Sequence, residues 1–198
     1  MDVEELYRRY AAGERDFPGV DLSHADLNVA NVEDLEELEP GQNYLSGINL
    51  SGANLTRADL SCVNLSDADL NGTELYDTRL KNVNLSGANL SGADMNSSIL
   101  EQVELNDANL SETSLCHATI RDSSLKRVNL EGAMLAEVYM TNCDLEGANL
   151  KKVMLEEAGF SNCHLRDAIF DEDNWWGRCY VRNTIMPGGN TLTNVIED

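Results

Sequence analysis

Aromatic residues, prolines, basic residues and long apolar runs are all scarce in this chain of 198 residues. Aromatics make up only 6% of it, so a core must be built from small and medium aliphatic side chains. Lys and Arg number 14 against 35 Asp and Glu, and a net charge of −21 would repel phosphates, so we expect no direct contact with nucleic acid. No apolar run approaches the about 20 residues that span a membrane, and the acidic start, MDVEELYRRY, is unlike a signal peptide. We therefore expect a cytoplasmic protein with no membrane partner.

Cysteines and histidines are too few and too scattered to predict chemistry. The five cysteines are odd in number and form no CxxC pair, which favours free thiols in a reducing compartment. Cys143 and Cys163, 20 residues apart, are interpreted as core thiols, and the sequence leaves open whether they are ever oxidised. No HExxH or Cys/His ligand spacing occurs, and the adjacent Cys116 and His117 lack a convincing third ligand. We expect no catalytic, cofactor-binding or metal-binding residues, no cofactor and no enzyme activity.

What the sequence has instead is a period of five. From Leu45 to Phe170 every fifth residue is apolar, and the residue two places before each is nearly always Ala, Val, Thr, Ser or Cys. The remaining positions are mostly Ser, Asn, Asp, Gly and charged residues, which are typical of turns and surfaces. A small and a large residue separated by one neighbour point the same way along an extended segment. Repeated short segments and turns therefore predict a coil whose core is completed only when neighbouring coils stack.

Three segments, ADLSC at 58–62, ANLSG at 88–92 and ANLKK at 148–152, match the consensus A(D/N)LXX. In these motifs the chain resembles the pentapeptide repeat family, and its start LYRRYAAGERDFPGVDL and ending NTIMPGG are similar to those of cyanobacterial members. The resemblance implies an all-β solenoid. The expected form is a right-handed quadrilateral β-helix of about seven to eight coils, each of four pentapeptides or about 20 residues.

The basic residues test the 20-residue coil independently. Residues 20 apart would lie on adjacent rungs, about 4.7–4.9 Å from each other, where opposite charges attract. All nine Lys and Arg residues between 45 and 170 have an acidic residue at an offset of 20, whereas only three do at an offset of 15 or of 25. Arg57 with Asp77 and Arg127 with Asp107 are examples. The charges therefore favour four faces per coil.

Residues 1–14 are predicted to form an N-terminal capping helix. Asp2 can cap it with Glu5 three residues later, and Gly13 can end it. An apolar stripe on this helix would seal the first coil in preference to docking a partner; it comprises Val3, Leu6, Tyr7 and Tyr10.

The repeat region is predicted to span 15–172, with an acidic insertion at about 33–42 that is either a short helix or a loop. Phe17, Leu22, Leu27 and Val32 keep the period in another phase, and eight extra residues then precede Leu45.

Residues 173–198 are predicted to form a C-terminal cap. The rule for small inward residues breaks down there, because Asp173, Arg178 and Asn183 fall in those positions, and CYVRNTI is a candidate terminal strand. Bulky residues either cover the last coil or form the seam of a homodimer, so a monomer or a homodimer through the C-terminal cap is expected. They are Trp175, Trp176 and Tyr180.

The outer surface is where the sequence suggests a function. The face that contains Leu55 is the most acidic, yet Met134 and Met154 stand outward on it, with Tyr139 at the next corner. Apolar side chains beside charged ones are typical of a contact surface; the neighbouring acids are Glu137, Glu156 and Glu157. We predict a non-catalytic protein–protein interaction or scaffold module with an unidentified protein partner.

The alternative is an acidic DNA mimic that acts on DNA gyrase or another DNA-binding protein. The resemblance brings this alternative, because some members of the family protect gyrase. The acidic face carries charge less densely than duplex DNA, which has about one charge per ~1.7 Å. Charge density therefore favours the interaction module.

Overall fold

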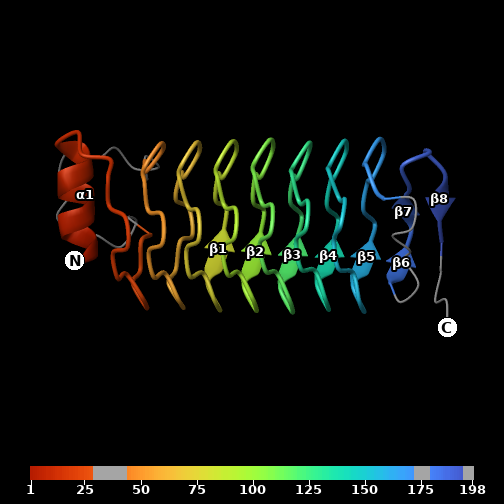
Figure 1. Cartoon of the computed structure of the whole chain (residues 1–198), viewed down its shortest axis with the longest axis horizontal. Coiled ribbons are helices and arrows are strands. Elements are labelled where there is room, and N and C mark those ends of the chain that lie inside the picture. The colour runs from red at the N-terminus through yellow and green to blue at the C-terminus, as the bar shows by residue number, and fades with distance from the viewer. Residues whose placement is uncertain (29–43, 172–178, 194–198) are drawn as a thin grey trace.

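The chain winds into a β-solenoid whose coils stack along one axis, with a helix at the N-terminal end (Figure 1). The computed structural model describes residues 1–28, 44–171 and 179–193, so the expected insertion at 33–42 lies outside the described residues. Helix α1 spans Val3–Ala11, and six short parallel strands form one sheet: β1 (Arg79–Lys81), β2 (Ile99–Glu101), β3 (Thr119–Arg121), β4 (Tyr139–Thr141), β5 (Gly159–Ser161) and β6 (Tyr180–Arg182). Near the C-terminal end, β7 (Thr184–Ile185) and β8 (Thr191–Leu192) pair antiparallel. The all-β solenoid expected from the repeat is confirmed.

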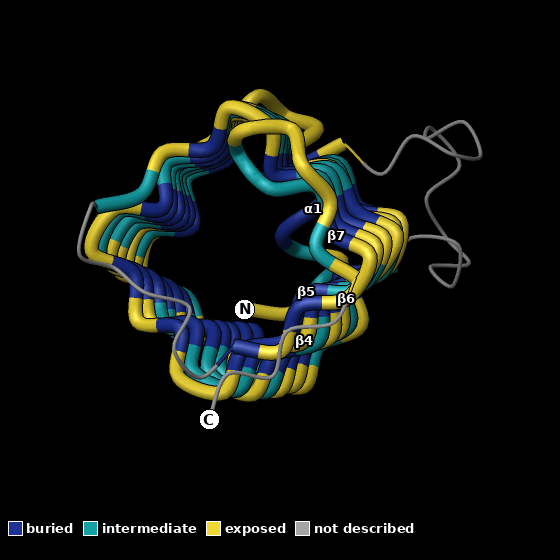
Figure 2. The backbone as a smooth tube through the Cα atoms, turned by 90° about the vertical axis from the view of Figure 1, so that its right-hand side faces the viewer, coloured by how far each residue is buried: buried dark blue, intermediate teal, exposed yellow. Residues whose placement is uncertain are grey.

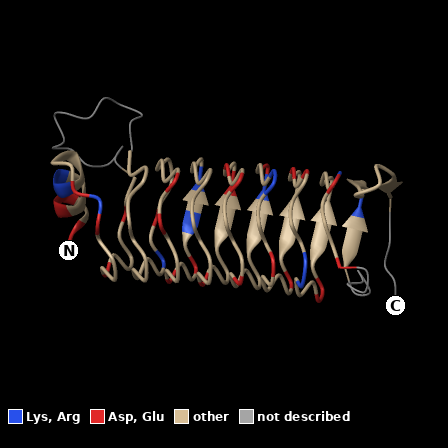
Figure 3. Ribbon diagram, turned by 45° about the horizontal axis from the view of Figure 1, so that its top comes forward, with Lys and Arg blue, Asp and Glu red and all other residues tan. Residues whose placement is uncertain are grey.

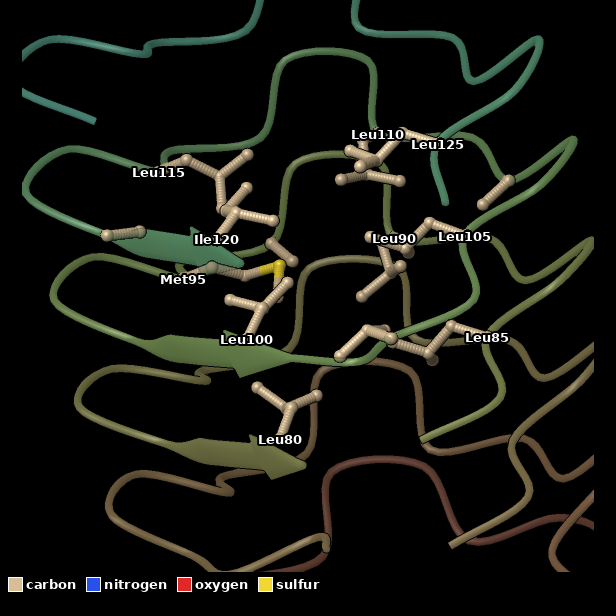
Figure 4. Close-up of a cluster of buried hydrophobic side chains, with 14 of the residues drawn as sticks. Leu80, Leu85, Leu90, Met95, Leu100, Leu105, Leu110, Leu115, Ile120 and Leu125 are labelled. Atoms are coloured by element: carbon tan, nitrogen blue, oxygen red, sulfur yellow. The ribbon is translucent and has the colours of Figure 1, made fainter. Parts of the chain in front are cut away.

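The core is a column of side chains along the axis. Every large position from Leu45 to Leu165 is buried, and so is every small position from Ile48 to Ala168. Seen along the axis, the buried residues line the inside of a four-sided frame and the exposed residues lie outside it (Figure 2). Large side chains from successive coils lie one above another, as Leu90 and Leu110 do (Figure 4). The predicted small–x–large inward pattern is confirmed.

Successive coils are in register at an offset of 20 residues. Each strand from β1 to β4 pairs in parallel with the next one, and isolated bridges continue the ladder on the other faces. The predicted coil length is therefore confirmed. One column of paired residues passes through eight rungs: Asp26, Asp59, Arg79, Ile99, Thr119, Tyr139, Gly159 and Tyr180.

The turns explain the polar positions of the repeat. The second residue of a turn takes a left-handed backbone, as at Gly52 (φ 63°), and this conformation favours Gly, Asn and Asp. On the face of Leu50, asparagine side chains form a ladder between coils. The Asn129 amide donates to the Asn109 side-chain oxygen at 2.9 Å, and the Asn149 amide donates to Asn129 at 2.9 Å. Polar side chains thus link the coils outside the core.

Helix α1 covers the first coil. The Asp2 side chain accepts a hydrogen bond from the backbone N–H of Glu5 at 2.8 Å, as predicted for the cap. Leu6 and Tyr7 are buried, and the Tyr7 hydroxyl donates to the carbonyl of Leu27 at 2.8 Å. The apolar stripe is therefore packed on the end of the solenoid.

The first coil is offset by 33 residues and not by 20. The backbone N–H of Phe17 donates to Asn49 at 2.8 Å and that of Leu27 donates to Asp59 at 2.7 Å. This offset exceeds the normal one by thirteen residues, whereas the sequence predicted eight extra residues. Leu27 and Leu45 consequently occupy successive inward positions. The position assigned to Val32 lies outside the described residues.

A second shift occurs near the C-terminal end. Gly159 pairs with Tyr180 at an offset of 21, so the inward positions move by one residue. Thr184 is buried in the small position, and Asn183 is exposed with a left-handed backbone (φ 48°). The expectation that Asn183 fills the small position is therefore wrong. Asp173 and Arg178 lie outside the described residues.

Candidate partner surface

Two methionines stand outward on the face of Leu55, as predicted. Met134 and Met154 pair on adjacent rungs, where Leu135 and Leu155 take the inward direction. Their side chains are 37% and 52% exposed, although methionine is usually buried. We call them the methionine pair.

A second group of outward side chains lies on the next face, on the strands of the six-stranded sheet. Tyr139 in β4 pairs with Gly159 in β5, which in turn pairs with Tyr180 in β6. Both tyrosines are half exposed, and Ile99 in β2, on the same column, is 41% exposed. We call the five stacked residues the tyrosine column: Ile99, Thr119, Tyr139, Gly159 and Tyr180.

The ring of Tyr139 leans over Gly159. A Cβ atom added to Gly159 would lie 2.9 Å from Cδ1 of the ring, which is closer than real Cβ contacts allow. The missing side chain of Gly159 thus leaves room for the ring to lie against β5. Sequence reasoning found Tyr139 but missed Ile99 and Gly159. The offset of 20 that links the two to Tyr139 was the available signal.

Glutamates occupy the turn between the two faces. The backbone N–H of Glu137 donates to the carbonyl of Glu156 at 2.8 Å, so the turns of adjacent coils stack. Glu137 and Glu157 both have left-handed backbones, at φ 54° and 57°. No Lys or Arg occupies this corner from Tyr76 to Glu157. We call the three acids the glutamate turn: Glu137, Glu156 and Glu157.

The predicted partner surface therefore has two parts. The methionine pair lies on one face, and Tyr139 lies on the next face beyond the glutamate turn. Glu137 is in contact with His117, whose Nδ1 lies 3.2 Å from its carboxylate. A partner that touches all of these residues has to contact both faces at once.

Elsewhere on the coils, bases and acids form part of the predicted ladder (Figure 3). Four of the predicted pairs at an offset of 20 lie within ion-pair distance: Arg57 with Asp77 (3.2 Å), Arg79 with Asp59 (3.7 Å), Arg127 with Asp107 (2.6 Å) and Lys126 with Glu146 (3.4 Å). Lys152 instead contacts Glu131 at 2.7 Å, an offset of 21. The Arg127 guanidinium donates to Asp107 and thereby holds the pKa of that carboxyl below its usual value. Exposed pairs of this kind contribute little to stability, because water screens the attraction.

One group of metal-ligand type side chains is found among the described residues. It comprises Asp144, Glu146 and His164, whose ligand atoms lie within 4.8 Å of one another. The ammonium of Lys126 lies 2.9 Å from Asp144 and 3.4 Å from Glu146, and these carboxylates raise the pKa of Lys126. The ammonium of Lys126 therefore already lies between the two carboxylates and compensates one of their two charges, and we assign no metal to the group.

The cysteines and their neighbours form no catalytic arrangement in the described part of the chain. Cys143 and Cys163 are buried on adjacent rungs, as predicted for core thiols. The contact with Cys163, together with burial, raises the pKa of the Cys143 thiol. The Cys116 thiol lies 3.8 Å from the Ser114 hydroxyl, whereas the adjacent His117 contacts Glu137.

The predicted cap or dimer seam is described only in part. Tyr180 lies in β6 with its side chain 49% exposed, and it completes the tyrosine column. Trp175 and Trp176 lie outside the described residues, so the choice between a cap and a seam stays a prediction. No helix in residues 1–28, 44–171 or 179–193 is long and apolar enough to cross a membrane.

Comparison with known proteins agrees with this architecture. The family profile described as Pentapeptide repeats matches residues 44–75, 64–102, 73–111, 100–132 and 133–171. A search of curated protein sequences found no match. Among solved structures, QnrB1, a plasmid-mediated fluoroquinolone resistance protein, is similar with a TM-score of 0.62 and 20% identity over 77% of this chain and 70% of that one.

Two cyanobacterial structures are also similar. HetL from Nostoc sp. strain PCC 7120, described as involved in heterocyst differentiation regulation, is 24% identical over 97% of this chain and 100% of its own, with a TM-score of 0.31. Rfr23 from Cyanothece 51142 is 26% identical over 86% of this chain and 96% of its own, also with a TM-score of 0.31. At these TM-scores the two likenesses carry no argument.

Proposed function

The chain belongs to the pentapeptide repeat family, and on that premise we propose that it is a non-catalytic protein-binding module. Its partner contacts the methionine pair and the tyrosine column. The observation that carries the proposal is the outward exposure of Met134, Met154, Tyr139 and Tyr180, each between 37% and 52%, on walls that are otherwise largely polar. Large apolar side chains near charges are the usual anchors of a protein interface.

Rigid support strengthens the proposal. The segment that carries Met134 is fixed by backbone hydrogen bonds to the coils on both sides: Met134 N–H donates to the carbonyl of Thr113 at 3.0 Å, and Leu135 N–H donates to the carbonyl of Met154 at 2.8 Å. A surface built on such a ladder loses little conformational freedom on binding, which favours affinity.

The environment of the reactive side chains supports a non-catalytic role. The thiols of Cys143 and Cys163 are buried, and the carboxylates of Asp144 and Glu146 both contact the ammonium of Lys126. A cytoplasmic location stays part of the proposal and is supported by the odd number of cysteines.

The charge arrangement favours a protein partner over mimicry of DNA. A mimic needs negative charge where DNA has phosphates, and here methionine side chains occupy such positions on the acidic face. Some acidic side chains along the coils also form ion pairs with Arg or Lys, as Asp77 and Asp107 do. A DNA gyrase supercoiling assay tests the alternative, because inhibition at stoichiometric protein would reverse this ranking.

The main experiment uses site-specific photo-crosslinking in the native host. A benzophenone amino acid is placed at Met154, at Tyr139 and, as a matched control, at Ile169, which is 49% exposed on the face of Leu50. We expect the same cross-linked protein at the first two positions and not at Ile169.

Two variants then separate apolar anchoring from charge. Met134→Ser/Met154→Ser should abolish the cross-link at Tyr139, whereas Glu74→Gln/Asp94→Asn on the same face should weaken it less. Retention in the methionine variant together with loss in the acid variant would contradict the proposal and favour the electrostatic mimic.

A further inference from the structure

The tyrosine column is an uncharged strip between two different flanks. No charged side chain stands on it over five rungs, from Ile99 to Tyr180. The glutamate turn borders one flank. On the other flank the same strands end in Glu101, Arg121 and Arg182, and the corner residues beyond them are linked by amides. Asn142 donates to Asp122 at 2.8 Å and Asn162 donates to Asn142 at 3.0 Å. The strip therefore has an acidic flank beside its central rungs and a flank of mixed charge opposite.

The spacing of the strip selects the backbone of a matching partner. Neighbouring rungs repeat at about 4.8 Å, so Tyr139 and Tyr180, two rungs apart, are separated by about 9.6 Å. An α-helix repeats its apolar positions at about 5.4 Å per turn and about 10.5 Å for seven residues. In an extended strand, side chains on the same face repeat every ~6.6 Å, which does not match the rung spacing of the column even for the first neighbouring pair.

We infer that the tyrosine column binds a basic amphipathic α-helix of another protein, lying along the solenoid axis. This inference rests on the proposed function and names the chemistry of the partner. The apolar face of the helix covers Tyr139, Tyr180 and Ile99, and its Lys or Arg residues face the glutamate turn. Four rung intervals cover about 19 Å, which corresponds to about 13 helical residues.

Charge complementarity favours a basic partner over a second copy of this chain as the occupant. The chain has a net charge of −21, and two copies that meet along this edge would bring their glutamate turns together. The three acids lie in two stacked turns, on the stretch of this corner from Tyr76 to Glu157 that has no Lys or Arg, so basic side chains of a partner are attracted most strongly there.

The test compares two peptides of identical composition. Each has about 18 residues of Leu and Lys; one places Leu at helical spacing and the other alternates Leu with Lys, which favours a strand. Binding to the full chain is measured by fluorescence anisotropy at physiological ionic strength. We expect the helical isomer to bind about tenfold more tightly or better. Equal binding, or preference for the alternating isomer, would overturn the inference.

Protein variants locate the binding. Tyr139→Ser and Glu156→Gln/Glu157→Gln should each weaken the helical peptide about tenfold, whereas Ile169→Ser on the opposite face should leave it within twofold. Gly159→Ala removes no anchor and no charge, but its Cβ would displace the Tyr139 ring; we expect severalfold weaker binding. Thermal unfolding of each variant confirms that it is folded. If Tyr139→Ser binds the peptide as the parent chain does, the inference is refuted.

Failure here is distinguishable from failure of the proposed function. A protein cross-linked at Met154 and Tyr139 in cells, combined with no preference for the helical peptide, would keep the binding module and reject the helix. Absence of any such cross-link would remove the binding module itself.

Discussion

Shortening one leucine in the middle of the core tests the stacking logic most directly. Leu110 is fully buried, and its face is held between the coils of Leu90 and Leu130: Leu90 N–H donates to Asn109 and Leu110 N–H donates to Asn129, both at 2.7 Å. Leu110→Ala removes three carbon atoms from this column and leaves a cavity.

The expected loss of stability lies above the low end of the range for such changes. Buried Leu→Ala substitutions cost about 2–5 kcal/mol, with the larger values where the surroundings cannot collapse into the cavity. Here the wall on each side is fixed by the 20-residue ladder, so the backbone cannot move inward without breaking hydrogen bonds. We expect about 3–5 kcal/mol for Leu110→Ala.

Urea unfolding followed by circular dichroism measures this cost. Leu110→Met, which conserves volume, serves as the control and should cost less than about 1.5 kcal/mol. Because each coil contacts only its neighbours, a lower slope of the unfolding curve in Leu110→Ala would indicate that the two halves separate. A cost below about 1 kcal/mol would refute the packing argument.

The remaining predictions concern the charges on the walls. A Lys126→Ala/Glu146→Ala double-mutant cycle should give a small coupling energy at low salt that shrinks in high salt, because both groups are more than one-third exposed. Absence of any coupling at low salt would show that this pair does not link the coils. Arg127 lowers the pKa of Asp107, so the resulting stabilisation is present above the unfolded pKa of Asp107 and is lost as the pH falls through the folded pKa. Carboxyl NMR titration should show a higher Asp107 pKa in Arg127→Gln than in the parent chain, and equal values would contradict the contact.

Much of the fold follows from local sequence because each five-residue unit carries its own inward pair. The small and large positions between Ile48 and Leu165 were predicted residue by residue, and all of them are buried. The coil length also followed, since side chains 20 apart become neighbours and opposite charges gather at that offset. The methionine pair was predicted for the same reason: its residues interrupt a regular polar position.

Only the tertiary structure showed how many residues the two irregular coils contain. The apolar Val32 continues the step of five after Leu27, so the sequence counted eight extra residues, whereas the first coil stacks at an offset of 33. One additional residue before β6 likewise moves Thr184, in place of Asn183, into the core. A periodic pattern states which residues face inward, but a change of phase is resolved only when the next coil's hydrogen bonds select one register.

The candidate partner surface was likewise predicted only in part from the sequence. Met134, Met154 and Tyr139 were visible as breaks in the repeat, because their exposure depends only on their place in the five-residue unit. The tyrosine column was not predicted, because Tyr180 joins it at an offset of 21 and Gly159 contributes through the side chain that it lacks. Sequence by itself determined which side chains point outward. The stacking of coils decided which of them lie side by side, because neighbours on a solenoid wall are set by hydrogen bonds between coils and not by distance along the chain.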